Sequence, residues 1–167
     1  VQCLGVSLQD DQLVLQTAAA NTELKVAIEA IEKNLGRVFC EGYSSEINFN
    51  SQPWLQSLSD VLDQGVVYLI DYGYPQREYY LPERTMGTLM CYYRHRAHDD
   101  ALWNPGLQDI TSFVDFTAVA EAAASTCFDL QGYTSQANFL LFAGLPALIE
   151  AEMAGDIQMQ LDRERVV

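Results

Sequence analysis

A carboxylate, an aromatic ring and a glycine follow directly after the most apolar short run of the chain. Asp71, Tyr72 and Gly73 come after residues 66–70, which read Val-Val-Tyr-Leu-Ile. In open α/β sheets, ligands bind beyond the carboxyl ends of the strands, so Asp71 stands where a binding site is expected. Its carboxylate suits a cationic or hydroxylic substrate, and the glycine permits close approach of the backbone. The structural alternative is an aspartate that caps a turn beside tyrosines packed on a rim.

Two histidines and an aspartate form the second polar group. His95, His98 and Asp99 could ligate a metal ion if they shared one face of a helix. They follow a predicted strand over residues 88–96, where positions three apart lie on opposite faces. A polar hinge is therefore favoured, no metal ligands are expected, and a metal-dependent hydrolase is the least favoured function.

Residues 105–116, which read Pro-Gly-Leu-Gln-Asp-Ile-Thr-Ser-Phe-Val-Asp-Phe, form the third group. A tight turn, a short edge strand and a helix capped by Asp115 explain most of this pattern. That interpretation assigns no role to Asp109 or Thr111, so both are retained as candidate site residues.

The elements that must position these residues alternate between strands and helices in one structural unit over residues 1–167. Helices are predicted where apolar residues recur at helical spacing between capping signals, and strands where short apolar or alternating runs occur. The predicted elements are a hairpin of residues 3–8 and 12–17 turned at Asp10-Asp11, a helix from Asn21 or Thr22 to Gly36, a helix over 51–64, a strand over 66–73 buried on both faces, a loop over 74–82, a strand over 88–96, a helix from Asp115, a strand over 128–134, and a helical last third from Ser135 with breaks at 144–146 and Gly155. This order indicates an α/β fold with part of its sheet missing from the chain.

The composition excludes several classes of protein. Of the 167 residues, 49% are hydrophobic and 19% are charged, which is typical of a globular chain. The net charge of −14 argues against binding to nucleic acid or to an anionic membrane surface. The four cysteines have no Cys-x-x-Cys spacing and are expected to be reduced and mostly buried in a cytoplasmic protein. Seven of the nine tyrosines lie within residues 68–93, which is typical of a half-buried rim.

Taken together, these motifs resemble one family. Leu-Ile-Asp-Tyr-Gly at residues 69–73 is followed by Gly-Thr-Leu at 87–89, His95-x-x-His98-Asp99, the segment 105–116, Gln-x-x-Phe-Leu at 136–140, and Gly144. This ordered set resembles the C-terminal half of the MidA-type S-adenosylmethionine-dependent methyltransferases, most firmly from Glu41 to Gly144. Eukaryotic relatives in that family are mitochondrial assembly factors of respiratory complex I, which methylate an arginine on one of its subunits.

The resemblance implies the C-terminal part of a Rossmann-like class I methyltransferase sheet with a substrate-side insertion. The family's glycine-rich cofactor loop would precede Val1 and its closing strand would follow Val167, so the cofactor-binding N-terminal half is expected to be absent. S-adenosylmethionine is then the cofactor of the complete protein, and no cofactor-binding residue or independent activity is expected in this chain. The implied location is cytoplasmic for a bacterial protein and mitochondrial for a eukaryotic one.

Arginine methylation would give the polar groups distinct roles. A guanidinium stays protonated, and carboxylates bind its planar fork through two hydrogen bonds. Asp71 and Asp109 are the expected anchors, and His95 or His98 would assist departure of the proton. Substrate contacts are expected from the remaining candidates, which are Glu46, Tyr72, Asp99 and Thr111.

The expected partner is a protein substrate such as a respiratory-complex subunit, with no nucleic acid and no membrane. Unpaired edges of an incomplete sheet also favour self-association. The alternative function is a non-catalytic acidic module that binds a basic protein. Residues 97–162 would supply much of its surface, because they hold ten acidic residues and no lysine or arginine.

Overall fold

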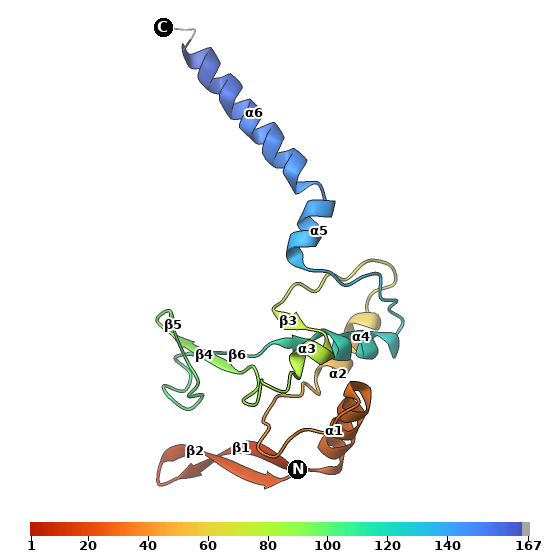
Figure 1. The fold of residues 1–167 in the computed structure, drawn as a ribbon, viewed down its shortest axis with the longest axis vertical. Helices are drawn as coiled ribbons and strands as arrows, with labels where there is room; N and C mark the ends of the chain where they lie inside the picture. Colours follow the sequence, from red (N-terminus) through yellow and green to blue (C-terminus); the bar gives the residue numbers. More distant parts are fainter. Residues whose placement is uncertain (165–167) are drawn as a thin grey trace. The chain divides into compact units, whose positions relative to one another are not determined.

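The computed structural model describes residues 1–164 as two compact units, Val1–Phe128 and the part of Asp129–Val167 that ends at residue 164. The sequence predicted a single unit. In the described residues all strands lie in the first unit, where they form one three-stranded and two two-stranded sheets (Figure 1). The mixed α/β character predicted from the sequence is confirmed.

The N-terminal hairpin forms as predicted. β1 (Gln2–Gln9) and β2 (Gln12–Ala19) pair antiparallel, and Asp10 and Asp11 turn the chain with φ of 48° and 57°. Positive φ at both central residues is what a type I′ turn requires. The register places five apolar residues, 41–66% exposed, on one face: Leu4, Val6, Leu8, Leu13 and Leu15.

The first helix, α1 (Thr22–Leu35), begins and ends where the capping residues predict. Asn21 Oδ1 accepts a hydrogen bond from the Leu24 amide at 2.8 Å. Gly36 ends the helix in the left-handed conformation, with φ of 68°. Ile31 is the residue of α1 that enters the core.

The predicted loop over residues 74–82 is wrong, because it contains the helix α3 (Gln76–Tyr79). Tyr79 and Tyr80 are each 3% exposed and form the core with Ile31. Burial raises the pKa of Tyr80 and raises that of Tyr79 to about 12. These two tyrosines therefore belong to the core and not to a half-buried rim, which is possible because their hydroxyl groups find partners inside the protein.

Two arginines support the end of α3. The Arg37 guanidinium donates a hydrogen bond to the Tyr80 carbonyl. Arg84 Nη1 donates to the carbonyls of Glu78 at 2.6 Å and Tyr79 at 2.9 Å. The last carbonyls of a helix have no partner within the helix, so these cations satisfy them and secure the core tyrosines.

The strand predicted over residues 66–73 is mostly wrong. Only its end forms β3 (Gly73–Tyr74), which pairs in parallel with β7 (Val114–Asp115). Residues 66–70 lie in no strand and are 37–77% exposed. A strand buried on both faces needs strands beside it and helices above and below it, and no strand of residues 1–164 pairs with this run.

A small sheet of order β5–β4–β6 follows. β4 (Met90–Tyr93) pairs antiparallel with β5 (Arg96–His98) and with β6 (Asp109–Thr111). The strand predicted over residues 88–96 is confirmed only for β4, because Arg94 and His95 form a hairpin turn with φ of 50° and 64°, and Arg96 begins the next strand. β6 is the edge strand that the sequence predicted.

The remaining helices follow the predictions in part. α2 (Ser51–Ser59) ends before the predicted residue 64, and α4 (Phe116–Ala124) begins at its predicted cap, Asp115. In the second unit, α5 (Gln136–Phe142) and α6 (Leu145–Glu164) are separated at the predicted break, but α6 continues through Gly155, where a second break was predicted. The strand predicted over residues 128–134 does not form, because no described strand pairs with it.

The cysteines are free, but most of them are not buried as the sequence predicted. Cys91 is buried in β4, whereas Cys3, Cys40 and Cys127 are exposed. Small size and weak polarity make cysteine compatible with either environment, so composition does not determine its burial.

Within residues 1–155, no single helix is long and apolar enough to cross a membrane. The pair Gln136–Phe142 and Leu145–Gly155 meets that criterion only jointly, and it is bent by 64°.

Replacement of Gly73 by alanine should strongly destabilise the first unit. An alanine Cβ would lie 2.2 Å from the Val114 carbonyl oxygen and 2.8 Å from Phe116 Cε2. The first of these is a backbone atom in the paired strand, so we expect a loss of about 3 kcal/mol in the free energy of unfolding, measured by chemical denaturation. Gly132→Ala is the matched control, because its Cβ meets no atom within 4 Å. Equal stability of the two variants would contradict the packing of β3 against β7.

Stability should fall at alkaline pH. The pKa of Tyr79 rises from 10.0 to about 12 on folding, so the stabilisation is complete below pH 10 and is lost as pH rises toward 12. The slope of unfolding free energy against pH over this range should be smaller in Tyr79→Phe than in the wild type. Tyr72→Phe is the control, since Tyr72 is 82% exposed, and it should keep the wild-type slope.

Candidate functional site

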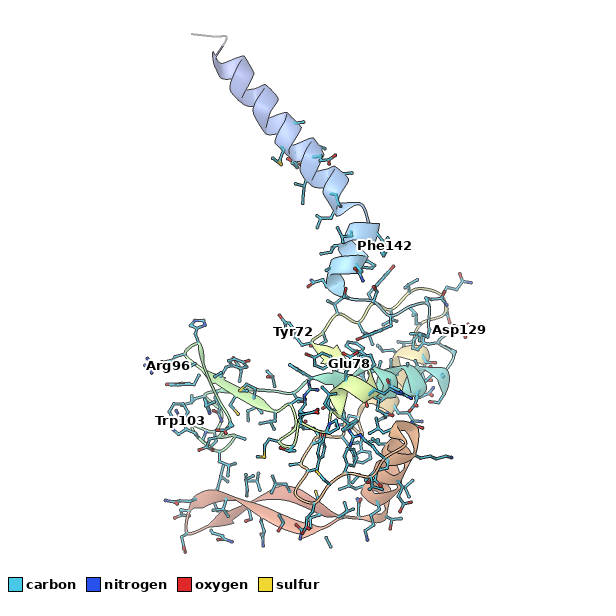
Figure 2. All side chains as sticks on the ribbon, in the orientation of Figure 1. Tyr72, Glu78, Arg96, Trp103, Asp129 and Phe142 are labelled. Carbon is cyan, nitrogen blue, oxygen red and sulfur yellow. The ribbon has the colours of Figure 1, made fainter. Side chains whose placement is uncertain are left out.

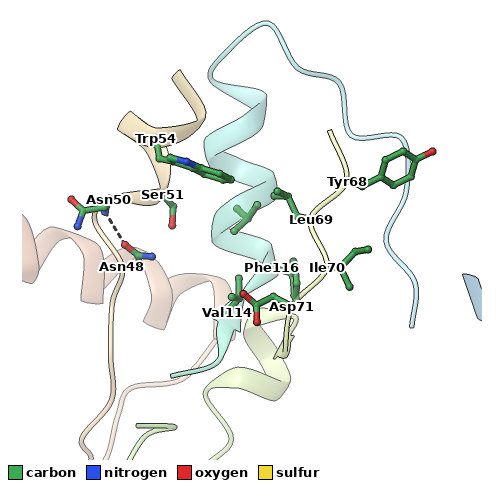
Figure 3. A pocket seen from close by; sticks show the side chains of 11 residues that line it. Asn48, Asn50, Ser51, Trp54, Tyr68, Leu69, Ile70, Asp71, Val114 and Phe116 are labelled. Atoms are coloured by element: carbon green, nitrogen blue, oxygen red, sulfur yellow. Dashed lines mark hydrogen bonds between the residues drawn. The ribbon is translucent and has the colours of Figure 1, made fainter. Parts of the chain in front are cut away.

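A cavity of about 500 Å³ lies beside the end of the apolar run, and Asp71 lines it. Figure 3 shows that the walls come from three parts of the first unit: the residues that precede β3, the start of α2 and the start of α4. Trp54 and Phe116 supply aromatic surface, while Asn48, Asn50 and Ser51 supply small polar groups. Asp71 therefore lines a cavity, and its role as a ligand-binding residue stays a prediction.

The backbone around Asp71 is held by two short hydrogen bonds. Asp71 Oδ1 accepts from the Tyr72 amide at 2.7 Å, and the Tyr72 carbonyl accepts from the Val114 amide at 2.9 Å. The first bond leaves the second carboxylate oxygen of Asp71 available to a ligand. The second bond extends the β3–β7 pairing by one residue and places Asp71 beside Val114, which also lines the cavity.

The start of α4 forms a second wall of the cavity. Asp115 caps this helix by accepting from the amides of Thr117 at 3.0 Å and Ala118 at 3.2 Å. Burial raises the pKa of Asp115, although these two hydrogen bonds and one from Gln76 oppose that rise. Asp115 therefore has a structural role, and Phe116, the next residue, is directed to the cavity wall.

The chemistry of the cavity suits a flat cation. Three aromatic residues line the cavity, Trp54, Tyr68 and Phe116. A carboxylate together with aromatic side chains can neutralise a positive charge and cover the apolar faces of the cation, as in recognition of guanidinium or methylated ammonium groups. The side-chain amides of Asn48 and Asn50 add polar groups to the cavity wall. The backbone N–H of Asn50 donates a hydrogen bond to Asn48 Oδ1 at 2.9 Å.

Glu46 lies outside the residues that line this cavity. Its carboxylate accepts hydrogen bonds from Thr88, Leu89 and Tyr79 at 3.0–3.3 Å. The sequence placed Glu46 among the residues that contact substrate. In the structure, its oxygens are engaged by the loop that precedes β4.

The histidines lie on the β4–β5 hairpin. His95 is at the hairpin turn and exposed, and His98 at the end of β5 packs edge-on against Trp103, with 5.0 Å between ring centroids. Both ring nitrogens of His98 are buried and have no hydrogen-bond partner in the described residues. Figure 2 shows Arg96 and Trp103 of this region well apart from Tyr72, so the hairpin and Asp71 form two separate groups.

Asp109 and Thr111 occupy the two ends of β6. Asp109 is exposed and faces Tyr92 in the register, and Thr111 Oγ1 donates to the Met90 carbonyl at 3.3 Å. Thr111 thus acquires the structural role that the sequence did not assign. Asp99 is exposed beside this sheet, and residues 1–155, whose side chains the structure describes, hold no group of three His, Cys, Asp or Glu side chains placed to bind a metal ion.

The structure adds residues that sequence reasoning missed. Trp54 falls within the helix predicted over residues 51–64, and Thr88 falls within the Gly-Thr-Leu motif at residues 87–89, but the sequence assigns neither of them a place in a site. In the structure Trp54 lines the cavity and Thr88 Oγ1 accepts from the Phe113 amide at 3.0 Å. No signal within a short stretch of sequence could have indicated either contact, because each joins segments that are distant in the chain.

Two solved structures from Burkholderia thailandensis are similar to this chain. One is a crystal structure with S-adenosyl-homocysteine bound, which is 39% identical, covers 94% of this chain and 40% of its own, and has a TM-score of 0.82. The other is a native crystal structure of an uncharacterized protein of the same superfamily, also 39% identical, with 90% and 39% coverage and a TM-score of 0.79. This chain therefore spans about 40% of the length of either matched protein.

No curated protein sequence matches the chain. Residues 1–134 match the profile of a family described as S-adenosyl-L-methionine-dependent methyltransferases. The match covers the cavity, the β4–β5 hairpin and every candidate site residue. The bound S-adenosyl-homocysteine of the similar structure agrees with the cofactor that this family uses. The chain belongs to this family of S-adenosyl-L-methionine-dependent methyltransferases.

Proposed function

We propose that the protein of which this chain is part methylates an arginine of a basic protein, and that the guanidinium enters the cavity beside Asp71. The observation that carries this proposal is the position of Asp71. It lies two residues before β3 and lines a cavity together with the aromatic side chains of Trp54 and Phe116. A guanidinium keeps its proton at neutral pH and binds a carboxylate through two parallel hydrogen bonds. Family membership favours this enzymatic role over a non-catalytic acidic module.

Methyl transfer from a sulfonium to nitrogen is an in-line displacement, so orientation of the nucleophile supplies much of the catalysis. In the proposal, Asp71 and Tyr72 hold the guanidinium at the cavity. Asp109, Thr111 and Asp99 on the small sheet engage the substrate chain beyond the cavity. His95 and His98 lie on the separate β4–β5 hairpin and do not line the cavity, so the proposal gives them no part in removing the proton of a guanidinium held at Asp71.

The charge of the chain supports a basic protein partner. The net charge of −14 attracts cationic segments and accelerates their encounter with the protein. A respiratory-complex subunit is the substrate that the family resemblance suggests, with a cytoplasmic or mitochondrial site of action. The exposed run at residues 66–70 supports a further proposal that copies of the chain associate through it.

The residues of this chain do not fit the cofactor. S-adenosylmethionine supplies the methyl group in this family. The sequence contains no Gly-x-Gly. The side chains of Asn21, Asp115 and Ser135 already accept hydrogen bonds from amides in the first turns of α1, α4 and α5. No residue of the chain is therefore assigned to hold the cofactor.

The role of Asp71 predicts a loss of methylation in Asp71→Asn. The substitution keeps the size of the side chain and removes the charge that pairs with the guanidinium, so kcat/KM should fall about 10-fold to 100-fold. The measurement is methyl incorporation into a basic protein substrate by the intact enzyme, followed by mass spectrometry. Asp63→Asn is the control, because it removes the same charge at an exposed position away from the cavity. Equal activity of both variants would remove Asp71 from the site.

Residues 1–167 alone should not bind S-adenosylmethionine. A calorimetric titration of this chain should show no binding heat, because the sequence holds no Gly-x-Gly turn that could present backbone amides to the cofactor. The Burkholderia thailandensis protein that binds S-adenosyl-homocysteine is the positive control. Micromolar affinity in the chain itself would show that these residues hold the cofactor.

A further inference from the structure

The carboxylate of Glu46 is saturated by partners inside the protein. It accepts from the Thr88 amide at 3.0 and 3.2 Å, from Thr88 Oγ1 at 3.1 Å, from the Leu89 amide at 3.1 Å and from the Tyr79 hydroxyl at 3.3 Å. A carboxylate offers about four lone-pair sites. These contacts therefore use the acceptor capacity that a substrate guanidinium would need.

The loop around Glu46 is shaped for this carboxylate. Ser44 forms a parallel bridge with Met86, and its amide donates to the Thr85 carbonyl at 2.8 Å. Gly87 has a φ of 73°, and a Cβ at that position would lie 2.3 Å from Glu46 Oε1. The backbone thus wraps closely around the carboxylate, which requires a glycine at this position.

Thr88 connects Glu46 to a third segment of the chain. A threonine hydroxyl has one proton and two lone pairs. Glu46 Oε2 can only accept, so the Thr88 hydroxyl donates its proton there and accepts from the Phe113 amide at 3.0 Å. Thr88 therefore joins the Glu46 loop to the segment that leads from β6 to β7.

This segment continues to Asp71. Val114 follows Phe113, and its amide donates to the Tyr72 carbonyl at 2.9 Å. The Tyr72 amide in turn donates to Asp71 Oδ1 at 2.7 Å. Hydrogen bonds and adjacent peptide units thus run from Glu46 to the carboxylate that lines the cavity. Asn48, two residues after Glu46, lines the same cavity.

We propose that Glu46 is a positioning residue, which acts through Thr88 and the Phe113–Val114 backbone. It fixes the relative position of two walls of the cavity, the segment that contains Asp71 and the segment that contains Val114. The expected effect of Glu46 on catalysis rests on the proposed function. The positioning role replaces substrate contact as the role of Glu46. The hydrogen bonds themselves are independent of that function and can be measured separately.

Three substitutions separate positioning from substrate binding. Glu46→Gln keeps the shape but turns an amide group toward backbone donors that need an acceptor. Thr88→Val keeps the volume and removes the hydroxyl that links Glu46 to Phe113. Thr88→Ser restores the hydroxyl and should restore the wild-type properties. Glu41→Gln removes the same charge at an exposed position and is the matched control.

The kinetic test is a double-mutant cycle in the intact methyltransferase. We expect Glu46→Gln and Thr88→Val each to lower kcat/KM by about 10-fold. The two variants should change kcat by the same factor and KM by the same factor. The kcat/KM of the double variant should be within about 3-fold of that of either single variant. If Glu46 bound the substrate directly, KM would rise in Glu46→Gln alone, and the loss of kcat/KM in the double variant would be the product of the losses in the two single variants. That outcome would overturn the proposal.

Hydrogen exchange supplies a readout that does not need activity. The Phe113 and Val114 amides should exchange about 10-fold faster in Glu46→Gln and in Thr88→Val, and at the wild-type rate in Thr88→Ser and Glu41→Gln. Unchanged exchange in the first two variants would overturn the proposal. If the wild type shows no methylation of basic proteins while these exchange rates change as expected, the proposed function fails and the positioning role stands.

Discussion

The structure of the first unit depends on the close parallel contact between β3 and β7. Each strand has only two residues, yet their pairing joins parts of the chain that are far apart in sequence. Gly73 makes the contact possible, because no side chain fits between its Cα and the Val114 carbonyl. The cavity beside Asp71 and the start of α4 both follow from this contact, since residues 114–119 provide one wall.

The buried apolar core of this unit is small, and hydrogen bonds connect the elements around it. Ile31, Tyr79 and Tyr80 form the central cluster, and several partly buried aromatic side chains surround it. Charged groups then connect the elements at the periphery of the core. Arg37 and Arg84 satisfy carbonyls at the end of α3, and Glu46 satisfies donors of the loop before β4. Such contacts are directional, so they determine geometry more precisely than apolar burial does.

Two of the exposed apolar surfaces in the first unit lie on consecutive or paired residues. One is the leucine-rich face of the β1–β2 hairpin, and the other is the run at residues 66–70. A two-stranded hairpin is marginally stable by itself, and exposed apolar patches of this kind mark interaction surfaces. The chain spans about 40% of the solved proteins that it resembles. The catalytic proposals therefore concern the complete protein. The β3–β7 contact, the core around Tyr79 and Tyr80 and the hydrogen bonds of Glu46 are properties of this chain.

The sequence by itself determined the local features of this protein and its family. Asn21, Gly36 and Asp115 act within a few residues of their own positions, so helix ends were predictable from them, and the ordered motifs identified the methyltransferase family. Tertiary structure decided the rest. Glu46 meets Thr88 across 42 positions, and residues 66–70 form no strand without a neighbour. A helix cap is satisfied by adjacent backbone, whereas a strand or a partly buried carboxylate such as that of Glu46 is defined by partners that only the folded chain brings near.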